Sequence, residues 1–457
     1  MAKMSLSRTT SWLGRSTFWV KQSNHTRSQY ARKSSTIHTR YDLNAATSFG
    51  GATGLIDFVL GTGIDREFWV HGLRKGRNTQ FHMDDIALTV IFGSLLGQER
   101  IFHFEDIEQD PLLKLKLDLP KLPDMTLLYK DLKRLGSDTG IKAIRSAHRQ
   151  ILKSLLPKGQ GIVVDIDSSV ETVYGAQQQS AVGYNPHHHG RASFHPLLAF
   201  DSLTGCCLYD ELRSGDAHTS DGFADFYKAM KDQLPDGVNI RAVRMDKGFT
   251  GEKVFQILEQ DKRDYVIKLK WTKRLAQLAQ APNLLWHCIT ESDREHCDVA
   301  SIMYQATSWD KPRRVVIVRR LDIEPQECLC ADWLWEYEAI ATTFDWSGED
   351  VWHFYNFRGN AENHIKEAKY GFAIDQFSSQ NFDANKAMQG LKLLAYNLLL
   401  LYKHVVLQPG VRQWTAGRLR RRLFHLPGIL VRHARQWSIR LPVYAKHRSL
   451  LMLHAAT

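Results

Sequence analysis

The spacing of apolar residues predicts helices in the first third of the chain. Apolar positions recur every three or four residues in Met83–Leu96, Thr126–Leu135 and Ile141–Leu155, which is the period of an amphipathic helix. A glycine-containing stretch, Gly159–Gly161, closes this region. Residues 42–158 are therefore expected to form an all-helical module, whose role the spacing alone does not reveal.

From Gly161 onward the pattern changes to short runs rich in β-branched residues that alternate with helical segments. In chain order, the expected elements are strands at Ile162–Ile166, His195–Phe200 and Cys206–Leu212, a helix at Thr219–Leu234, a strand at Val238–Met245, a helix at Gly251–Gln260 and a strand at Tyr265–Leu269. A turn-like link at 201–205 predicts a hairpin between the second and third strands. This order predicts an α/β fold with a mixed sheet.

A second strand-rich segment spans residues 271–350, and we expect it to be a β-rich insertion in the core. Its alternating apolar and polar positions lie in Ala300–Thr307, Arg314–Leu321 and Leu334–Thr343. A long helix is expected from about Arg358 and another over Asn385–Lys403, before a final hairpin. The expected division is a basic, flexible N-terminus at 1–41, the helical module at 42–158, a core in two parts at 159–270 and 351–405, the insertion at 271–350 and a basic tail at 406–457.

The charge is concentrated at the two ends of the chain. The net charge is +11, with eight Lys or Arg and no acid in Met1–Tyr41, and eleven and no acid in Leu401–Thr457. Basic ends around an acid-containing centre suit a polyanion such as nucleic acid, whose phosphates release counterions on neutralisation. The alternative is that both ends are simply solvated, and composition does not decide between them.

Cysteine usage and hydropathy favour a cytoplasmic protein. All six cysteines lie between Cys206 and Cys330 without a framework spacing, so reduced thiols are expected. The candidate zinc-binding pairs are His287-Cys288, His296-Cys297 and Cys328-x-Cys330. None has a CxxC spacing, so we expect ordinary cysteines. The apolar run Leu393–Tyr402 is too short for a membrane span, and the N-terminus lacks the apolar core of a secretory signal, although its composition resembles that of a transit peptide.

Three aspartates stand at predicted strand ends. Asp165 and Asp167 close the first strand on the same sheet face, and Asp246 closes a later one. Such residues converge at the carboxyl edge of an open α/β sheet, where ligands bind. Each taken alone is more typical of a turn. Asp165 and Asp167 are both candidates, and Asp167 is favoured because it lies nearer the strand end and the small residues that follow.

A more specific pattern is Tyr355-x2-Arg358-x3-Glu362-x6-Lys369. At about 100° per residue these four positions fall within a ~60° arc of one helix face. One acidic side chain between two cationic ones suits a site in which the acid binds a metal ion and the cations bind neighbouring phosphates. The alternative is a surface helix in which Arg358 and Glu362 form an i,i+4 ion pair.

This spacing resembles the signature of a large branch of bacterial insertion-sequence transposases, whose catalytic core is ribonuclease H-like. The Asp-Ile-Asp-Ser-Ser strand resembles their first-aspartate motif. The stretch from Gly183–Pro186 through Gly190-Arg191, followed by Ser193–Leu198, resembles one group within that branch. The resemblance runs from about Gly161 to Lys369. It implies a ribonuclease H-like mixed sheet core with a β-rich insertion, preceded by the helical module. A module in this position would bind DNA, mediate dimerisation or simply pack on the core, and the spacing does not tell these roles apart. The sequence departs from the family at Ser168-Ser169, where a Gly-Thr pair is common, and at His187–His189, where lysines are common.

By this resemblance Asp167, Asp246 and Glu362 form a catalytic metal-binding triad. Two Mg²⁺ ions, for which Mn²⁺ may substitute, would be held with Asp167 as the bridge. The enzyme would cut at transposon ends and join the 3′-hydroxyl to target DNA. The residues expected to contact DNA are Tyr355, Arg358, Lys369, Arg418, Arg420, Arg421 and Arg422.

The expected partners are double-stranded DNA, as terminal inverted repeats and target, and a second copy of the chain in the DNA complex, with no membrane. The expected location is a bacterial cytoplasm, in association with the nucleoid. Two alternatives stay open. One is an inactive transposase-derived DNA-binding protein, and the other is a metal-dependent nuclease without strand transfer.

Overall fold

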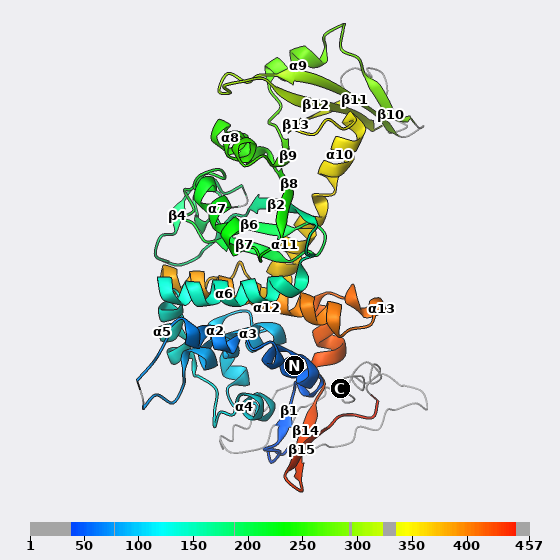
Figure 1. Ribbon diagram of the computed structural model, residues 1–457. Helices are drawn as coiled ribbons and strands as arrows, with labels where there is room; N and C mark the ends of the chain where they lie inside the picture. Colours follow the sequence, from blue (N-terminus) through cyan, green and yellow to red (C-terminus); the bar gives the residue numbers. More distant parts are fainter. Residues whose placement is uncertain (1–37, 77, 187, 292–294, 323–334, 445–457) are drawn as a thin grey trace, which may run out of the picture. The chain divides into compact units, whose positions relative to one another are not determined.

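The computed structural model describes residues 38–76, 78–186, 188–291, 295–322 and 335–444. The chain divides into two compact units, Met1–Leu43 and Asn44–Thr457, and the helices and strands of the described residues lie in the second (Figure 1). Most of the predicted basic N-terminus at 1–41, as well as His187 and Cys328-x-Cys330, lies outside the described residues.

The centre of the second unit is a nine-stranded mixed sheet with the strand order β10-β11-β12-β13-β9-β8-β2-β6-β7. Its strands are β2 (Gly161–Ser168), β6 (Leu197–Asp201), β7 (Cys207–Glu211), β8 (Asn239–Met245), β9 (Asp264–Lys268), β10 (His287–Glu291), β11 (Glu295–Tyr304), β12 (Arg313–Asp322) and β13 (Glu336–Thr342). The β2–β8 and β8–β9 pairs are parallel and the other pairs are antiparallel. The α/β class with a mixed sheet is thereby confirmed.

The hairpin predicted at 201–205 is confirmed between β6 and β7. The side chain of Asp201 accepts hydrogen bonds from the backbone N–H and the hydroxyl of Thr204, both at 2.7 Å, and Gly205 has a φ of +72°. A Cβ there would lie 2.4 Å from the His364 ring, so the close approach and the backbone both require glycine. The strand expected from His195 begins only at Leu197, because Pro196 has no N–H for the ladder.

The strands between residues 271 and 350 extend the central sheet. β11, β12 and β13 form near the segments predicted there, while β10 and the helix α9 (Lys273–Ala279) were not expected. β13 pairs with β9, with Thr342 opposite Val266. The insertion is therefore continuous with the core by backbone hydrogen bonds rather than a sheet of its own.

The helices predicted in the first third of the chain are observed as α3 (Met83–Leu96), α5 (Met125–Leu135) and α6 (Asp138–Leu155). They pack on the long helix α12 (Phe382–Val405) and share one hydrophobic core with it. The region is also joined to the C-terminal end, since β1 (Ala46–Thr47) pairs with β14 (Gly428–His433). These helices therefore do not have a hydrophobic core of their own, separate from that of α12.

Further α-helices and strands complete the second unit. They are the helices α1 (Thr53–Gly61), α2 (Asp65–Val70), α4 (Pro111–Leu117), α7 (Phe223–Gln233), α8 (Glu252–Gln260), α13 (Pro409–Arg412) and α14 (Ala416–Leu419), and the strands β3 (Glu171–Thr172), β4 (Ala181–Val182), β5 (Ala192–Phe194) and β15 (Gln436–Arg440). No helix in the described part of the chain has both the length and the apolar character needed to cross a bilayer.

The helix expected from about Arg358 is confirmed as α11 (Gly359–Phe372), while Tyr355 lies in a separate helix, α10 (Gly348–Asn356). The Arg358 N–H donates to the Tyr355 carbonyl at 2.8 Å, an i,i+3 bond, where an α-helix has i,i+4 bonds. The prediction of a single helical stripe was wrong in this respect, because Tyr355 belongs to α10 and the acid belongs to α11.

Candidate functional site

Asp167 is the penultimate residue of β2, and 19% of its side chain is exposed. The Arg358 guanidinium lies beside it, with Nη2 2.8 Å from Oδ2 of Asp167. The Nη1 atom of the same guanidinium lies 3.6 Å from Oε1 of Glu362 in α11. Arg358, placed between α10 and α11, therefore links the end of β2 to the helix that carries the predicted glutamate.

Asp246 reaches the same place because β8 runs parallel to β2. The register places Ile166 opposite Met245, so Asp167 and Asp246, the residues that follow them, lie at the same edge of the sheet. The charges of Asp246 and Glu362 both act on the carboxyl of Asp167. The structure thus brings together three carboxylates that are 79 and 116 positions apart along the chain.

Burial and like charge make Asp167 an unusual carboxyl group. Its pKa is raised to about 6, mainly by burial; Arg358 lowers the pKa, and the charges of Asp246 and Glu362 contribute to raising it. A carboxylate in such surroundings is stabilised by an added cation. Carboxylates are also the hard oxygen donors that Mg²⁺ and Mn²⁺ prefer. The side chains at this edge therefore fit a divalent metal site.

Asp165, the other candidate on β2, is engaged elsewhere. Arg244, its register partner on β8, donates from Nε and Nη2 to both of its carboxylate oxygens, at 2.7 and 2.8 Å. Both side chains are 1% exposed. Since one buried guanidinium occupies both oxygens of Asp165, Asp167 is the better candidate for the first metal ligand.

Arg244 also connects the sheet to the signature helices, a role that the sequence analysis missed. Its Nη1 donates to the carbonyl oxygen of Phe354 in α10 at 2.8 Å, and Nη2 contacts the hydroxyl of Ser202. The signal was an arginine inside a strand that is otherwise apolar at its carboxyl end, because a buried guanidinium needs an acidic partner.

The other signature residues are also held by neighbours. The Nζ atom of Lys369 lies 2.8 Å from Oε1 of the buried Glu171 and contacts the hydroxyl of Ser169. Tyr355 is buried, with the Lys268 ammonium 5.9 Å from the centre of its ring. Glu171 was not singled out from the sequence, because only the fold places it beside Lys369.

The arginines of the basic tail separate into two kinds. Arg418, Arg421 and Arg422 are exposed. Arg420 is buried, and its Nε and Nη2 donate to the carbonyl oxygens of Leu95 and Ser94 at the end of α3, at 2.8 and 2.7 Å. Burial lowers its pKa to about 10. The prediction that Arg420 contacts DNA is not retained, since its guanidinium stabilises the end of a helix.

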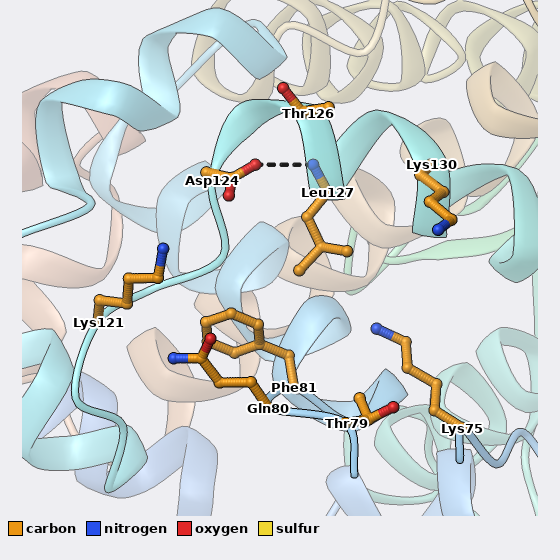
Figure 2. A pocket seen from close by; sticks show the side chains of 9 residues that line it. All are labelled: Lys75, Thr79, Gln80, Phe81, Lys121, Asp124, Thr126, Leu127 and Lys130. Carbon is orange, nitrogen blue, oxygen red and sulfur yellow. Dashed lines mark hydrogen bonds between the residues drawn. The ribbon is translucent and has the colours of Figure 1, made fainter.

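A cationic cavity of about 550 Å³ lies between α5 and the segment before α3. Figure 2 shows the amino groups of Lys75, Lys121 and Lys130 around Phe81 and Leu127. Lys75 forms an ion pair with the buried Asp131, whereas Lys130 is exposed. The cavity is thus a surface depression with an excess of positive charge.

Comparison with known proteins identifies the family. The family model described as transposase DDE domain group 1 matches residues 30–457. No curated protein matches the chain. Among solved structures, the chain is similar to one in the cryo-EM structure of the piggyBac transposase synaptic complex with hairpin DNA, with 11% identity, a TM-score of 0.44, and coverage of 82% of this chain and 78% of that chain. Because the family model spans nearly the whole sequence, the chain belongs to the transposase DDE domain family.

Proposed function

We propose that the protein is a DNA transposase that cuts at transposon ends and joins the freed 3′-hydroxyl to target DNA. The proposal is supported by Arg358, which links Asp167 to Glu362, and by Asp246, which lies at the same edge of the sheet and whose charge acts on Asp167. The family membership supports the same reading. The proposed ligands of the two Mg²⁺ ions are these three carboxylates, and bound ions would neutralise the phosphate and lower the pKa of the attacking water or hydroxyl.

The chain's own residues would position the DNA. Arg358 is a fixed cation between two of the carboxylates, which suits it to bind a phosphate of the cleaved strand. The contact between Arg244 and the Phe354 carbonyl holds α10 against β8, and so keeps Arg358 in reach of Asp167. Lys369 would bind a further phosphate of the transposon end, with Glu171 fixing its side chain until DNA arrives.

The wider DNA-binding surface is proposed from charge and exposure. Arg418, Arg421 and Arg422 would contact phosphates, and the cavity with Lys121 and Lys130 would accept another part of the DNA backbone. Two ends are cut in one transposition event, so a homodimer on DNA is the proposed assembly.

The finer identity and domain division are part of the same proposal. We assign the chain to the insertion-sequence branch with the Tyr-x2-Arg-x3-Glu-x6-Lys signature. The five strands β7-β6-β2-β8-β9, with antiparallel pairs on one side of β2 and parallel pairs on the other, support a ribonuclease H-like core. The proposed division is a basic N-terminus at 1–41, a helical module at 42–158, core segments at 159–270 and 351–405, a β-rich insertion at 271–350 and a basic tail at 406–457.

The test is Glu362→Gln, assayed on a labelled DNA fragment that carries the terminal repeat flanking the coding region. Removal of the charge should abolish Mg²⁺-dependent nicking and strand transfer while end binding remains, because the amide keeps the shape of the side chain but is a poor metal ligand. Glu349→Gln, an exposed glutamate on α10, is the matched control and should retain activity. Undiminished cleavage by Glu362→Gln would refute the proposal.

The assay also separates the two alternatives. An inactive DNA-binding protein would shift the terminal-repeat fragment without cleaving it under any divalent cation. A nuclease would cleave but would give no joined product when supplied with a pre-cut end that bears a 3′-hydroxyl.

A further inference from the structure

A second group of potential ligands lies on the β10–β11 hairpin, at the end of the sheet order opposite β7. Cys288 is the register partner of Asp298, and His296 lies two residues before Asp298 on the same strand. Because side chains alternate along a strand, all three lie on one face of the hairpin. One ligand atom from each, a sulfur, a ring nitrogen and a carboxylate oxygen, lies within 4.8 Å of the others.

Neighbours in the sequence do not form this group. Alternation separates His287 from Cys288, and His296 from Cys297, so each adjacent pair is divided between the two faces. Cys297 is fully buried and packs with Val299 in the core on the other face. The sequence therefore indicated the correct residue types but paired each histidine with the adjacent cysteine. Only the pairing of β10 with β11 shows that Cys288 lies beside His296 and Asp298.

The carboxylate of Asp298 is held in a fixed orientation. Its Oδ1 lies 2.8 Å from Nε2 of His296, and its Oδ2 accepts from Nε of Arg319 at 2.7 Å. The Arg319 guanidinium lies over the rings of Trp286 and Trp335, at 4.3 and 4.6 Å from their centres. A hydrogen bond to the outer oxygen of a carboxylate is the usual support behind a metal ligand.

We propose that Cys288, His296 and Asp298 bind a Zn²⁺ ion. A thiolate, an imidazole and a carboxylate form a mixed donor set that zinc accepts, and a thiolate among them disfavours Mg²⁺. The charges of the thiolate and of Asp298 balance those of the ion. Glu291, opposite His296 across the hairpin, or a water molecule completes a tetrahedral site. The ion would join β10, the edge strand of the described sheet, to its neighbour β11.

The competing explanation is a hydrogen-bonded chain of charged groups without a metal. Arg319, Asp298 and His296 already contact one another in sequence, and the Cys288 thiol is also hydrogen-bonded to Asp298. The state of Cys288 therefore distinguishes the two explanations, because only a metal site requires a sulfur-metal bond.

The experiment is a cobalt titration of the full-length protein after treatment with a chelator. Co²⁺ bound to a thiolate gives a charge-transfer absorption band that carboxylate ligands cannot produce, so the carboxylate site at Asp167 stays silent. The band should saturate at one Co²⁺ per chain and disappear when Zn²⁺ is added. Cys288→Ser and His296→Ala should both lose it, and circular dichroism checks that each variant is folded.

Matched variants make the result specific. Cys297→Ala removes a thiol from β11, the strand of His296 and Asp298, but from its opposite face, so this variant should keep the band. Glu362→Gln should also keep it. Arg319→Gln should weaken the affinity by about 10–100-fold, the effect typical of groups that orient a metal ligand. Absence of a band in the wild-type protein, or a full band in folded Cys288→Ser, would overturn the proposal.

Discussion

Two aspartates on one strand, two residues apart, have opposite environments. Asp165 is 1% exposed and paired through both oxygens to Arg244, which is also 1% exposed. Asp167 is 19% exposed and makes a single ion pair with Arg358, while two further carboxylates act on it. The Asp165–Arg244 pair, called here the closed pair, is buried with its charges balanced and stabilises the fold. The Asp167–Arg358 pair, called here the open pair, is partly exposed and has an excess of negative charge that an added cation can balance.

The contrast shows that residue type and sheet face do not by themselves identify a catalytic acid. Burial raises the pKa of both aspartates, and a guanidinium opposes that effect in both. The difference is that Asp246 and Glu362 are arranged around Asp167. A group of like charges is unfavourable for folding, and such arrangements are retained where they bind a ligand.

The largest expected effect comes from breaking the open pair. Asp167→Asn should reduce Mg²⁺-dependent cleavage of end DNA on the order of 10³-fold or more, since several kcal/mol of stabilisation by the metal ions are lost. The amide oxygen can still accept from Arg358, so the unfolding free energy should change by less than about 1 kcal/mol. Cleavage rates and urea denaturation of the same preparations give both values. Loss of fold together with loss of activity would contradict the distinction between the two aspartates.

Breaking the closed pair should have the reverse outcome. Asp165→Ala leaves the buried Arg244 guanidinium without its carboxylate and should lower the unfolding free energy by about 3–5 kcal/mol. The double variant Asp165→Leu/Arg244→Met should regain part of this loss, because it removes the unpaired charge. Both are measured as shifts of the urea midpoint. If Asp165→Ala left the midpoint unchanged but removed cleavage, the roles of Asp165 and Asp167 would have to be exchanged.

The sequence was sufficient to predict the elements that make this comparison possible, but not the comparison itself. Short apolar runs located β2 and β8, and the signature spacing located Arg358 and Glu362. Alternation placed Asp165 and Asp167 on one face, so it could not choose between them. The choice depends on the register that sets Asp165 opposite Arg244, and a parallel pairing between strands far apart in the chain leaves no local pattern.

Other misses have the same origin in tertiary structure. The break between α10 and α11 falls at Phe357-Arg358, inside the signature whose spacing predicted one continuous helix face. The helices of the first third share a core with α12, which lies more than two hundred residues later. The adjacent pairs at Cys288 and His296 were set aside because they lack a CxxC spacing, and the cluster with Asp298 forms only when β10 pairs with β11.

A smaller effect is expected from titrating the open pair. The pKa of Asp167 is raised to about 6, and the group must lose its proton to bind a metal. Metal affinity should therefore be constant above about pH 7 and fall about tenfold per pH unit below the pKa. Mn²⁺ binding followed by electron paramagnetic resonance between pH 5 and 8 measures this, with Asp167→Asn as the control. An affinity that is unchanged down to pH 5 would show that the proton does not compete at this carboxyl.

The smallest effect tests the same contrast in the basic tail, where the Arg420 side chain is buried and the Arg421 side chain is exposed. Arg421→Ala should weaken DNA binding severalfold and reduce the slope of log affinity against log salt by about 0.9, the value for one phosphate contact. Arg420→Ala removes the donor to the Ser94 and Leu95 carbonyls, so it should lower the melting temperature and leave that slope unchanged in the folded fraction. Fluorescence anisotropy with a labelled duplex at several salt concentrations measures the slope. If the slope changed for Arg420→Ala and not for Arg421→Ala, exposure in the free protein would be a poor guide to phosphate contact, and the assignment of the tail arginines would be reversed.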